Sequence, residues 1–246
     1  MKLKQFTLVA VLSLMSGAAA ADEVSSLLKA ADLFRMSSDN MQIETQISTF
    51  NRDGNLEKER RYMVFSQAKR QSLVLMQSPA EKGQKMLMLG DDFWMVLAGS
   101  QRPLRITPLQ KLLGDASIGD VSTMSWSQDY EGEVVGEERC DDKPCVRLSL
   151  NANRKGVAYQ HIDLWLGKAR HEPIKADLYV LSGKFAKQAN FIMDKPNAPT
   201  TVVEMVLLDK LGSNKETRMR YLSRKDKTVP EQWMNPMFLA KNPNLE

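Results

Sequence analysis

The chain has 246 residues, 26% of them charged, and a formal net charge of +4. That length suits one large β domain or two small ones. Without residues 1–21, which include Lys2 and Lys4, the net charge falls to +2. No cluster of lysines and arginines dominates the remaining sequence. We therefore expect no nucleic-acid partner.

Residues 1–21 are typical of a secretory signal peptide. Basic MKLKQ precedes the apolar run FTLVAVLSLMSGAAA, and small residues allow cleavage before Ala21 or Asp22. A retained transmembrane anchor is the alternative, but the run is short for one. No cysteine follows it to accept an N-terminal lipid. The pattern predicts a non-lipidated periplasmic protein with one domain, residues 22–246, which we expect to be a monomer.

An amphipathic helix is predicted over residues 22–36, with Asp22 as its cap. Its apolar positions recur at helical spacing: Leu27, Leu28, Ala31 and Phe34. The apolar period then changes to two, because Met41, Ile43 and Ile47 alternate with polar residues. About a dozen strands follow this rule or lie between turn residues: 41–47, 57–66, 72–77, 86–89, 93–97, 130–136, 146–150, 159–166, 174–181, 191–193, 201–208 and 217–222.

The strands are joined mostly by short turns, which favours a mainly β fold with a curled antiparallel sheet. Residues 101–121 interrupt this pattern with prolines and glycines, and we expect a helical turn at 109–113. Long connections of this kind are often functional. A short amphipathic helix is predicted over 233–240 near the end of the chain.

The hairpin KMLMLGDDFWMVLAG, residues 85–99, is apolar on both faces, whereas a half-buried strand should alternate. Methionine is favoured on surfaces that accept varied apolar ligands, although ordinary core filling is the alternative for any single Met. We predict that one face of this hairpin lines an apolar cavity. The predicted cavity-wall residues are Met86, Met88, Phe93, Trp94 and Met95.

Two arginines follow this hairpin directly. Arg102 and Arg105 are candidates to contact a phosphate or carboxylate head group at the mouth of the cavity. The alternative is that both lie in a solvated loop.

The only cysteines are Cys140 and Cys145, on either side of the turn residues DDKP. In an oxidising compartment this spacing predicts a disulfide across a hairpin. A redox centre or half of a metal site is the alternative, but CxxC spacing is absent and no histidine is nearby in sequence.

Catalytic patterns are missing. His161 and His171 are the only histidines, and no GxSxG, P-loop or GxGxxG motif occurs. Adjacent carboxylates such as Asp91 and Asp92 point to opposite faces of a strand and do not form a catalytic pair. We therefore expect no enzymatic activity, no metal and no cofactor.

The segment KGQKMLMLGDDFWMVLAGSQRPLRITPLQKLLGDASIGDV resembles the signature region of LolA-like outer-membrane lipoprotein-sorting proteins. QSPAEKG, WSQDYEGEVVGEE and YQHIDLWLGKARHEPIKADLYVLSGK add to this resemblance in the expected order. It implies a LolA/LolB-like fold, in which an incomplete β-barrel is closed by helices around a hydrophobic cavity. It also implies a periplasmic role beside inner-membrane transporters of the resistance-nodulation-division (RND) or MMPL type.

Together these observations predict a carrier that binds a lipid or the acyl chains of a lipoprotein and moves them between membranes. Residues 100–119 and the helices are the predicted lid. Two alternatives remain: an RseB-like lipid-sensing or interaction module that regulates a membrane partner, and a lipid hydrolase that uses His161 and His171.

Overall fold

The computed structural model describes residues 15–122, 125–208 and 216–245. Within them, a 13-stranded antiparallel sheet is built from two consecutive runs of strands. The first run is β1 (Met41–Phe50), β2 (Leu56–Gln67), β3 (Gln71–Met76), β4 (Lys85–Leu89), β5 (Asp92–Val96) and β6 (Leu104–Ile106). The second run is β9 (Tyr130–Cys140), β10 (Lys143–Ala152), β11 (His161–Gly167), β12 (Pro173–Tyr179), β13 (Phe185–Met193), β14 (Val202–Leu208) and β15 (Glu216–Asp226).

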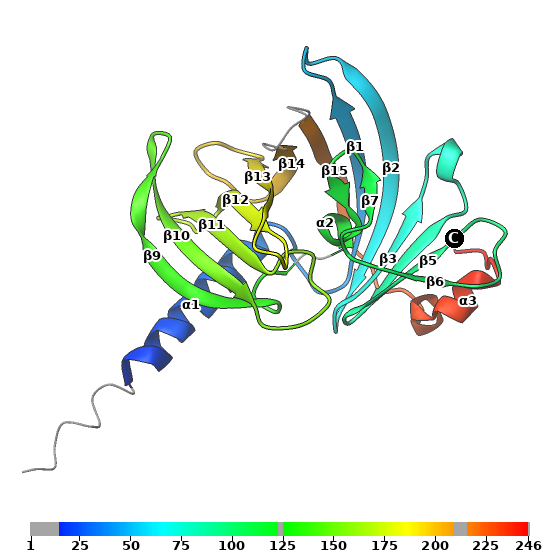
Figure 1. Ribbon diagram of the computed structural model, residues 1–246, viewed down its shortest axis with the longest axis horizontal. Coiled ribbons are helices and arrows are strands. Elements are labelled where there is room, and N and C mark those ends of the chain that lie inside the picture. Colours follow the sequence, from blue (N-terminus) through cyan, green and yellow to red (C-terminus); the bar gives the residue numbers. More distant parts are fainter. Residues whose placement is uncertain (1–14, 123–124, 209–215, 246) are drawn as a thin grey trace, which may run out of the picture.

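The two runs join where β1 pairs with β15, and the sheet ends at β6 and β9. Figure 1 shows the result as two curved arms on either side of this junction. Register shifts on both sides of β1, at Glu44/Thr45 and Thr49/Phe50, are bulges of the kind that increase local twist. The predicted curled antiparallel sheet, which does not close into a barrel, is therefore confirmed.

Successive side chains along each strand point alternately to an inner and an outer face of the sheet. In β1 the inner residues Met41, Ile43 and Ile47 are almost completely buried, and the residues between them are mostly half-buried. The inner faces of both arms share one large hydrophobic core. A smaller core lies on the outer face of the first arm.

Helix α1 (Met15–Leu33) packs against β9 and the inner core through Val24, Leu28 and Ala31. It begins seven residues before the predicted start, so Asp22 lies inside the helix and does not cap it. The run of alanines before Asp22 explains the extension, because alanine has the highest helix propensity. Among the described residues, none of the helices has both the length and the apolar character needed to cross a membrane.

The long connection also differs from the prediction. The expected helical turn at 109–113 is instead strand β7 (Lys111–Leu113), which pairs with β8 (Ala116–Ser117). The helical turn of this segment comes later, as α2 (Ile118–Ser122). The remaining helices are η1 (Pro79–Glu81), η2 (Glu231–Met234) and α3 (Pro236–Ala240).

The C-terminal segment covers the outer face of the β4–β5 hairpin. Leu87 and Val96 face outward and share a core with Trp233 and Leu239. Figure 1 shows α3 outside the strands of the first arm. The hairpin is therefore apolar on both faces because it is buried on both: the inner core covers one face, and the end of the chain covers the other.

Candidate functional site

The inner face of the second arm surrounds a cavity of about 50 Å³. Ala176 and Ala189 lie opposite each other in the β12–β13 register, and these small side chains leave space between larger neighbours. The apolar lining consists of Ala158, Ile162, Ala176, Leu178, Ala189, Phe191 and Met205. A cavity of this size holds a few water-sized molecules and is too small for an extended acyl chain.

Arg35 contributes a buried positive charge to the cavity lining. It lies just beyond α1, on the same buried stripe as Val24, Leu28 and Ala31. The carbon of its guanidinium lies 4.1 Å from the centre of the Trp126 ring, which is cation–π geometry. The cavity lining therefore combines an apolar wall with a buried cation.

Asp120 forms a second polar group in the lining. Its carboxylate accepts hydrogen bonds from Lys187 Nζ at 2.6 Å and from Tyr159 OH at 2.9 Å. The backbone N–H and hydroxyl of Ser117 also donate to it, each at 2.7 Å. Burial raises the pKa of the Tyr159 phenol, and the Asp120 carboxylate raises it further, so this tyrosine is a neutral donor. Asp120 thus fixes α2 to the sheet.

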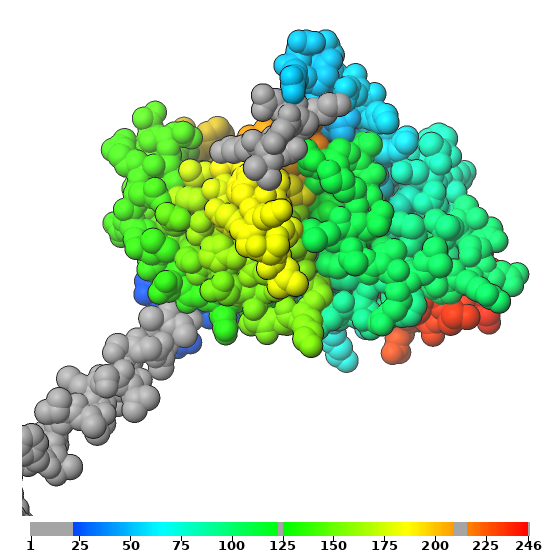
Figure 2. Space-filling view, viewed as in Figure 1, coloured from blue at the N-terminus to red at the C-terminus, as the bar shows by residue number. Residues whose placement is uncertain are grey.

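Residues 107–122, which we call the lid segment, cover the inner face. Leu113, Ala116, Ile118 and Val121 belong to the inner core. Backbone hydrogen bonds close the segment on itself, including Gly119 N to Pro108 O at 2.8 Å. Figure 2 shows the space between the two arms filled on this face.

Of the predicted lid, 100–119, the part from residue 107 onward lies over the inner face. Residues 104–106 instead form edge strand β6.

Four charged side chains, the Arg70 cluster, connect the two arms. Arg70 and Asp91 come from turns of the first arm, and Asp129 and Arg154 flank strands of the second. Arg70 Nε lies 2.7 Å from Asp129, and both Arg70 and Arg154 lie 2.9 Å from Asp91. Burial raises the pKa of Asp129 despite the opposing effect of Arg70.

Close backbone contact accompanies this cluster. Gly156 lies so near Asp91 that an added Cβ would come within 2.5 Å of the Asp91 Cα. The turn of the β4–β5 hairpin and the β10–β11 loop are therefore held together by charge and by backbone contact.

Comparisons with known proteins agree with this architecture. A family model described as "-like: Uncharacterized protein" matches residues 68–241, which is more than half of the chain. A LolA superfamily protein from Nitrosomonas europaea is 27% identical, with a TM-score of 0.78 over 88% of this chain and 97% of that one. The chain belongs to the LolA-like family.

Two further structures share the LolA-like fold. One is a domain from Vibrio parahaemolyticus described in terms of outer-membrane lipoprotein sorting, 15% identical, with a TM-score of 0.70 over 91% of this chain and 99% of that one. The other is a DUF1329 family protein from Desulfovibrio piger, 20% identical, with a TM-score of 0.70 over 88% and 97% of the two chains. A comparison with curated proteins finds no match.

The structure divides the predicted cavity-wall residues of this LolA-like protein between two faces. Met86, Met88, Phe93 and Met95 belong to the inner core. Trp94 belongs to the outer core under the C-terminal segment, because it alternates with Phe93 and Met95 along β5. None of the five lines the 50 Å³ cavity, which lies in the second arm.

The two arginines predicted at the head group lie on the surface. Arg105 pairs with Asp92 and stacks on Trp94, and Arg102 lies in an exposed turn. The arginine that does line the cavity, Arg35, was not predicted. The sequence could have indicated this role, because Arg35 continues the helical spacing of the buried residues Val24, Leu28 and Ala31.

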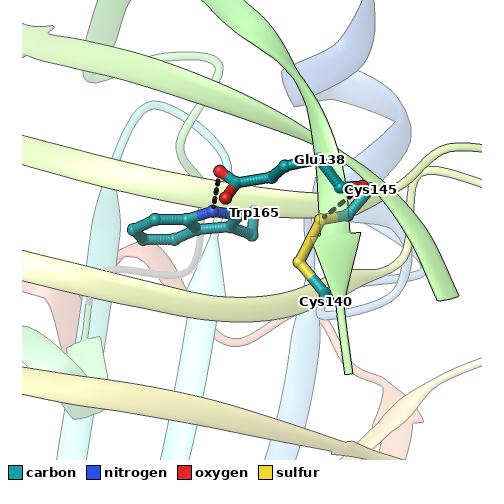
Figure 3. Close-up of a disulfide and its surroundings, with 4 residues drawn as sticks. All are labelled: Glu138, Cys140, Cys145 and Trp165. Atoms are coloured by element: carbon teal, nitrogen blue, oxygen red, sulfur yellow. Dashed lines mark hydrogen bonds between the residues drawn. A yellow bond between two sulfur atoms is a disulfide. The ribbon is translucent and has the colours of Figure 1, made fainter. Parts of the chain in front are cut away.

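The predicted disulfide between Cys140 and Cys145 is confirmed. It joins the ends of β9 and β10 and packs with Trp165 on the outer face of the second arm. The Trp165 indole donates a hydrogen bond to Glu138 at 2.6 Å, as Figure 3 shows. No other cysteine exists in the chain, so this LolA-like protein has no free thiol.

Proposed function

We propose that this protein is a periplasmic carrier that binds the acyl chains of a lipid or lipoprotein between its two arms. The observation that carries the proposal is the apolar cavity with Arg35 in its lining and the lid segment above it. Burial of each methylene contributes about 0.8 kcal/mol, so a long chain would bind tightly. The similarity to a domain described for lipoprotein sorting supports the same cargo class.

Because the cavity measures only about 50 Å³, cargo enters when the lid segment and the two arms move apart. The Arg70 cluster then holds the closed state. Arg35, 6% exposed and stacked on Trp126, is the residue we propose to contact the anionic or carbonyl group of the cargo. The carrier needs no catalytic step, metal or cofactor. An inner-membrane transporter of the RND or MMPL type is its proposed partner.

Mass spectrometry of the protein purified from the periplasm without detergent tests the cargo. We expect a stoichiometric lipid or acylated peptide in the wild type. Ala189→Phe should lower the amount of bound cargo, because the added ring occupies part of the cavity. The matched control is Ile192→Phe, which changes an exposed residue on the outer face of the same strand and should keep the cargo.

An empty wild-type protein that also fails to take up a fluorescent fatty acid would contradict the cavity as a cargo site. A protein that binds lipid but does not release it to acceptor membranes would be a sensor and not a carrier. Crosslinking in intact cells tests the transporter separately, and recovery of no RND or MMPL protein would contradict that partner.

A further inference from the structure

A second site lies on the outer face of the first arm, where the C-terminal segment crosses the sheet (Figure 1). A groove of about 430 Å³ separates the strands from residues 242–245. Its apolar surfaces come from Met63, Phe65, Leu75 and Trp233. Small-molecule sites in proteins have volumes of about 300 to 1,000 Å³, so this groove is of ligand size.

The groove has an unbalanced charge. Lys82, Lys85 and Lys227 line it, and none of its lining residues in the described part of the chain is acidic. A second opening, of about 450 Å³, lies on the other side of the same segment and shares Lys85 and Asn242 with the groove. That opening adds Lys241 and again no carboxylate.

Lys85 is the central residue of this arrangement. It begins β4, points outward with Leu87 and is only 6% exposed. Its ammonium group donates to Asn242 Oδ1 at 2.8 Å and to Gly83 O at 3.2 Å, both of which are neutral acceptors. Buried charges in proteins are usually paired with an opposite charge. None of the described carboxylates pairs with Lys85, which therefore faces the groove as a cation suited to an anion.

We propose that the groove binds a small amphiphile with one anionic head group, which contacts Lys85, and an apolar tail, which lies on Met63, Phe65 and Leu75. The head group is a carboxylate or a phosphate, since either can accept hydrogen bonds from lysine. Lys82 and Lys227 lie at the rim and attract the same charge. This site is separate from the cavity between the arms, because the sheet lies between them.

The test uses methionine methyl groups as reporters, since Met63 lies in the groove and Met205 lines the inner cavity. The full mature protein is labelled with ¹³C-methyl methionine, and Met63→Leu and Met205→Leu assign the two signals. Decanoate, decyl phosphate and uncharged decanol are then titrated separately. We expect the anions to shift the Met63 methyl saturably and decanol to bind about tenfold more weakly, as the loss of one charge-assisted hydrogen bond predicts.

Lys85→Met should reduce decanoate affinity at the Met63 signal by about tenfold. The matched control is Lys58→Met, an exposed lysine on β2 that lies outside the groove. If Lys85→Met fails to fold, the rim variant Lys82→Gln/Lys227→Gln tests the same charge without altering a buried residue. A saturable shift with decanoate but not with decyl phosphate would assign a carboxylate ligand, and the reverse result a phosphate.

Three results would overturn the proposal: no Met63 shift with either anion, equal affinity for decanol, or unchanged affinity in both lysine variants. A shift of Met205 alone would overturn this site and leave the proposed carrier function intact. A shift of the Met63 signal alone would support ligand binding in the groove. It would also indicate that the ten-carbon ligands do not bind in the inner cavity.

Discussion

Asp120 illustrates how one carboxylate can organise a lid. It accepts from Ser117, Tyr159 and Lys187, and the Lys187 side chain is itself buried. Removal of one partner from a buried ion pair costs about 3–5 kcal/mol because the other charge remains buried. We expect Asp120→Asn to lower the free energy of unfolding by that amount, measured by urea denaturation.

The matched control for Asp120→Asn is Asp115→Asn on the same lid segment. Asp115 pairs with Lys111, whose side chain is 69% exposed, so the pair is open to solvent on the lysine side and should contribute about 0–1 kcal/mol. Equal losses in the two variants would show that the Asp120 group does not hold the lid.

Lys85 gives a pH signature at the residue scale. Burial lowers its pKa from the ordinary value of 10.5 in the folded protein. Between that lowered pKa and 10.5 the unfolded chain binds more protons, so this residue makes the free energy of unfolding rise with pH. We expect wild type to gain stability relative to Lys85→Met as pH increases toward 10.5.

The tyrosines also titrate at alkaline pH, but they are the same in wild type and in Lys85→Met. Their contribution therefore cancels in the stability difference between the two proteins. The charged groups that face Lys85 across the two openings are Lys82, Lys227 and Lys241, so no described carboxylate in that lining masks the effect. Lys58→Met should follow wild type at every pH. A stability difference between wild type and Lys85→Met that stays constant with pH would contradict the assigned environment.

At the scale of elements, the Arg70 cluster holds two arms that are far apart in sequence. Asp129 has only 1% of its side chain exposed, so Arg70→Met should destabilise the protein by about 3–5 kcal/mol. Because the arms are less firmly joined, fluorescent fatty-acid uptake should also become faster in stopped-flow measurements. Arg105→Met removes an ion pair that is more than half exposed and should change stability by about 0–1 kcal/mol.

If Arg70→Met lost stability without any change in uptake rate, the cluster would be structural and would not control opening. The uptake rate therefore separates the two roles, which unfolding data alone cannot do.

The disulfide acts on a single hairpin. Cys140 and Cys145 are five residues apart, and chain entropy predicts about 2 kcal/mol for so short a loop. Reduction of the bond should lower the unfolding free energy by about that amount. Fatty-acid uptake should not change, because the bond packs with Trp165 on the outer face. A marked change in uptake on reduction would connect this hairpin to the cavity.

Local sequence patterns predicted most elements but not their partners. The alternation of β1 and the turn between Cys140 and Cys145 depend on neighbouring residues, and both appear as expected. By contrast, the β1–β15 pairing joins residues at least 166 positions apart, and no local pattern specifies it. The same holds for the outer face of β4–β5, whose cover comes from η2 and α3.

The candidate site was harder to predict than the fold. The cluster of methionines in the β4–β5 hairpin led to the prediction of a cavity wall there. The cavity lies in the other arm, where the small side chains of Ala176 and Ala189 leave space. Space left by small side chains depends on which strands pair, so it cannot be read from composition. Arg35 is the exception, since its position on a buried helical stripe is visible in the sequence.

For the molecule as a whole, a curled sheet can change its internal volume when its arms separate. An acyl chain that enters between them gains about 0.8 kcal/mol for each buried methylene, which is close to fourfold in affinity. We therefore expect affinities for fatty acids of increasing length, measured by calorimetry, to rise about fourfold per methylene and then reach a plateau. The chain length at which the affinity stops rising measures how far the arms open.

Ala189→Phe should shift this plateau to shorter chains, because the added ring occupies part of the cavity. Ile192→Phe should leave the curve unchanged, since that side chain lies on the outer face. An affinity independent of chain length would mean that the tail stays in solvent, and the arms would then not enclose cargo. A plateau that moves to shorter chains in Ala189→Phe but not in Ile192→Phe would instead locate the tail between the arms, beneath the lid segment.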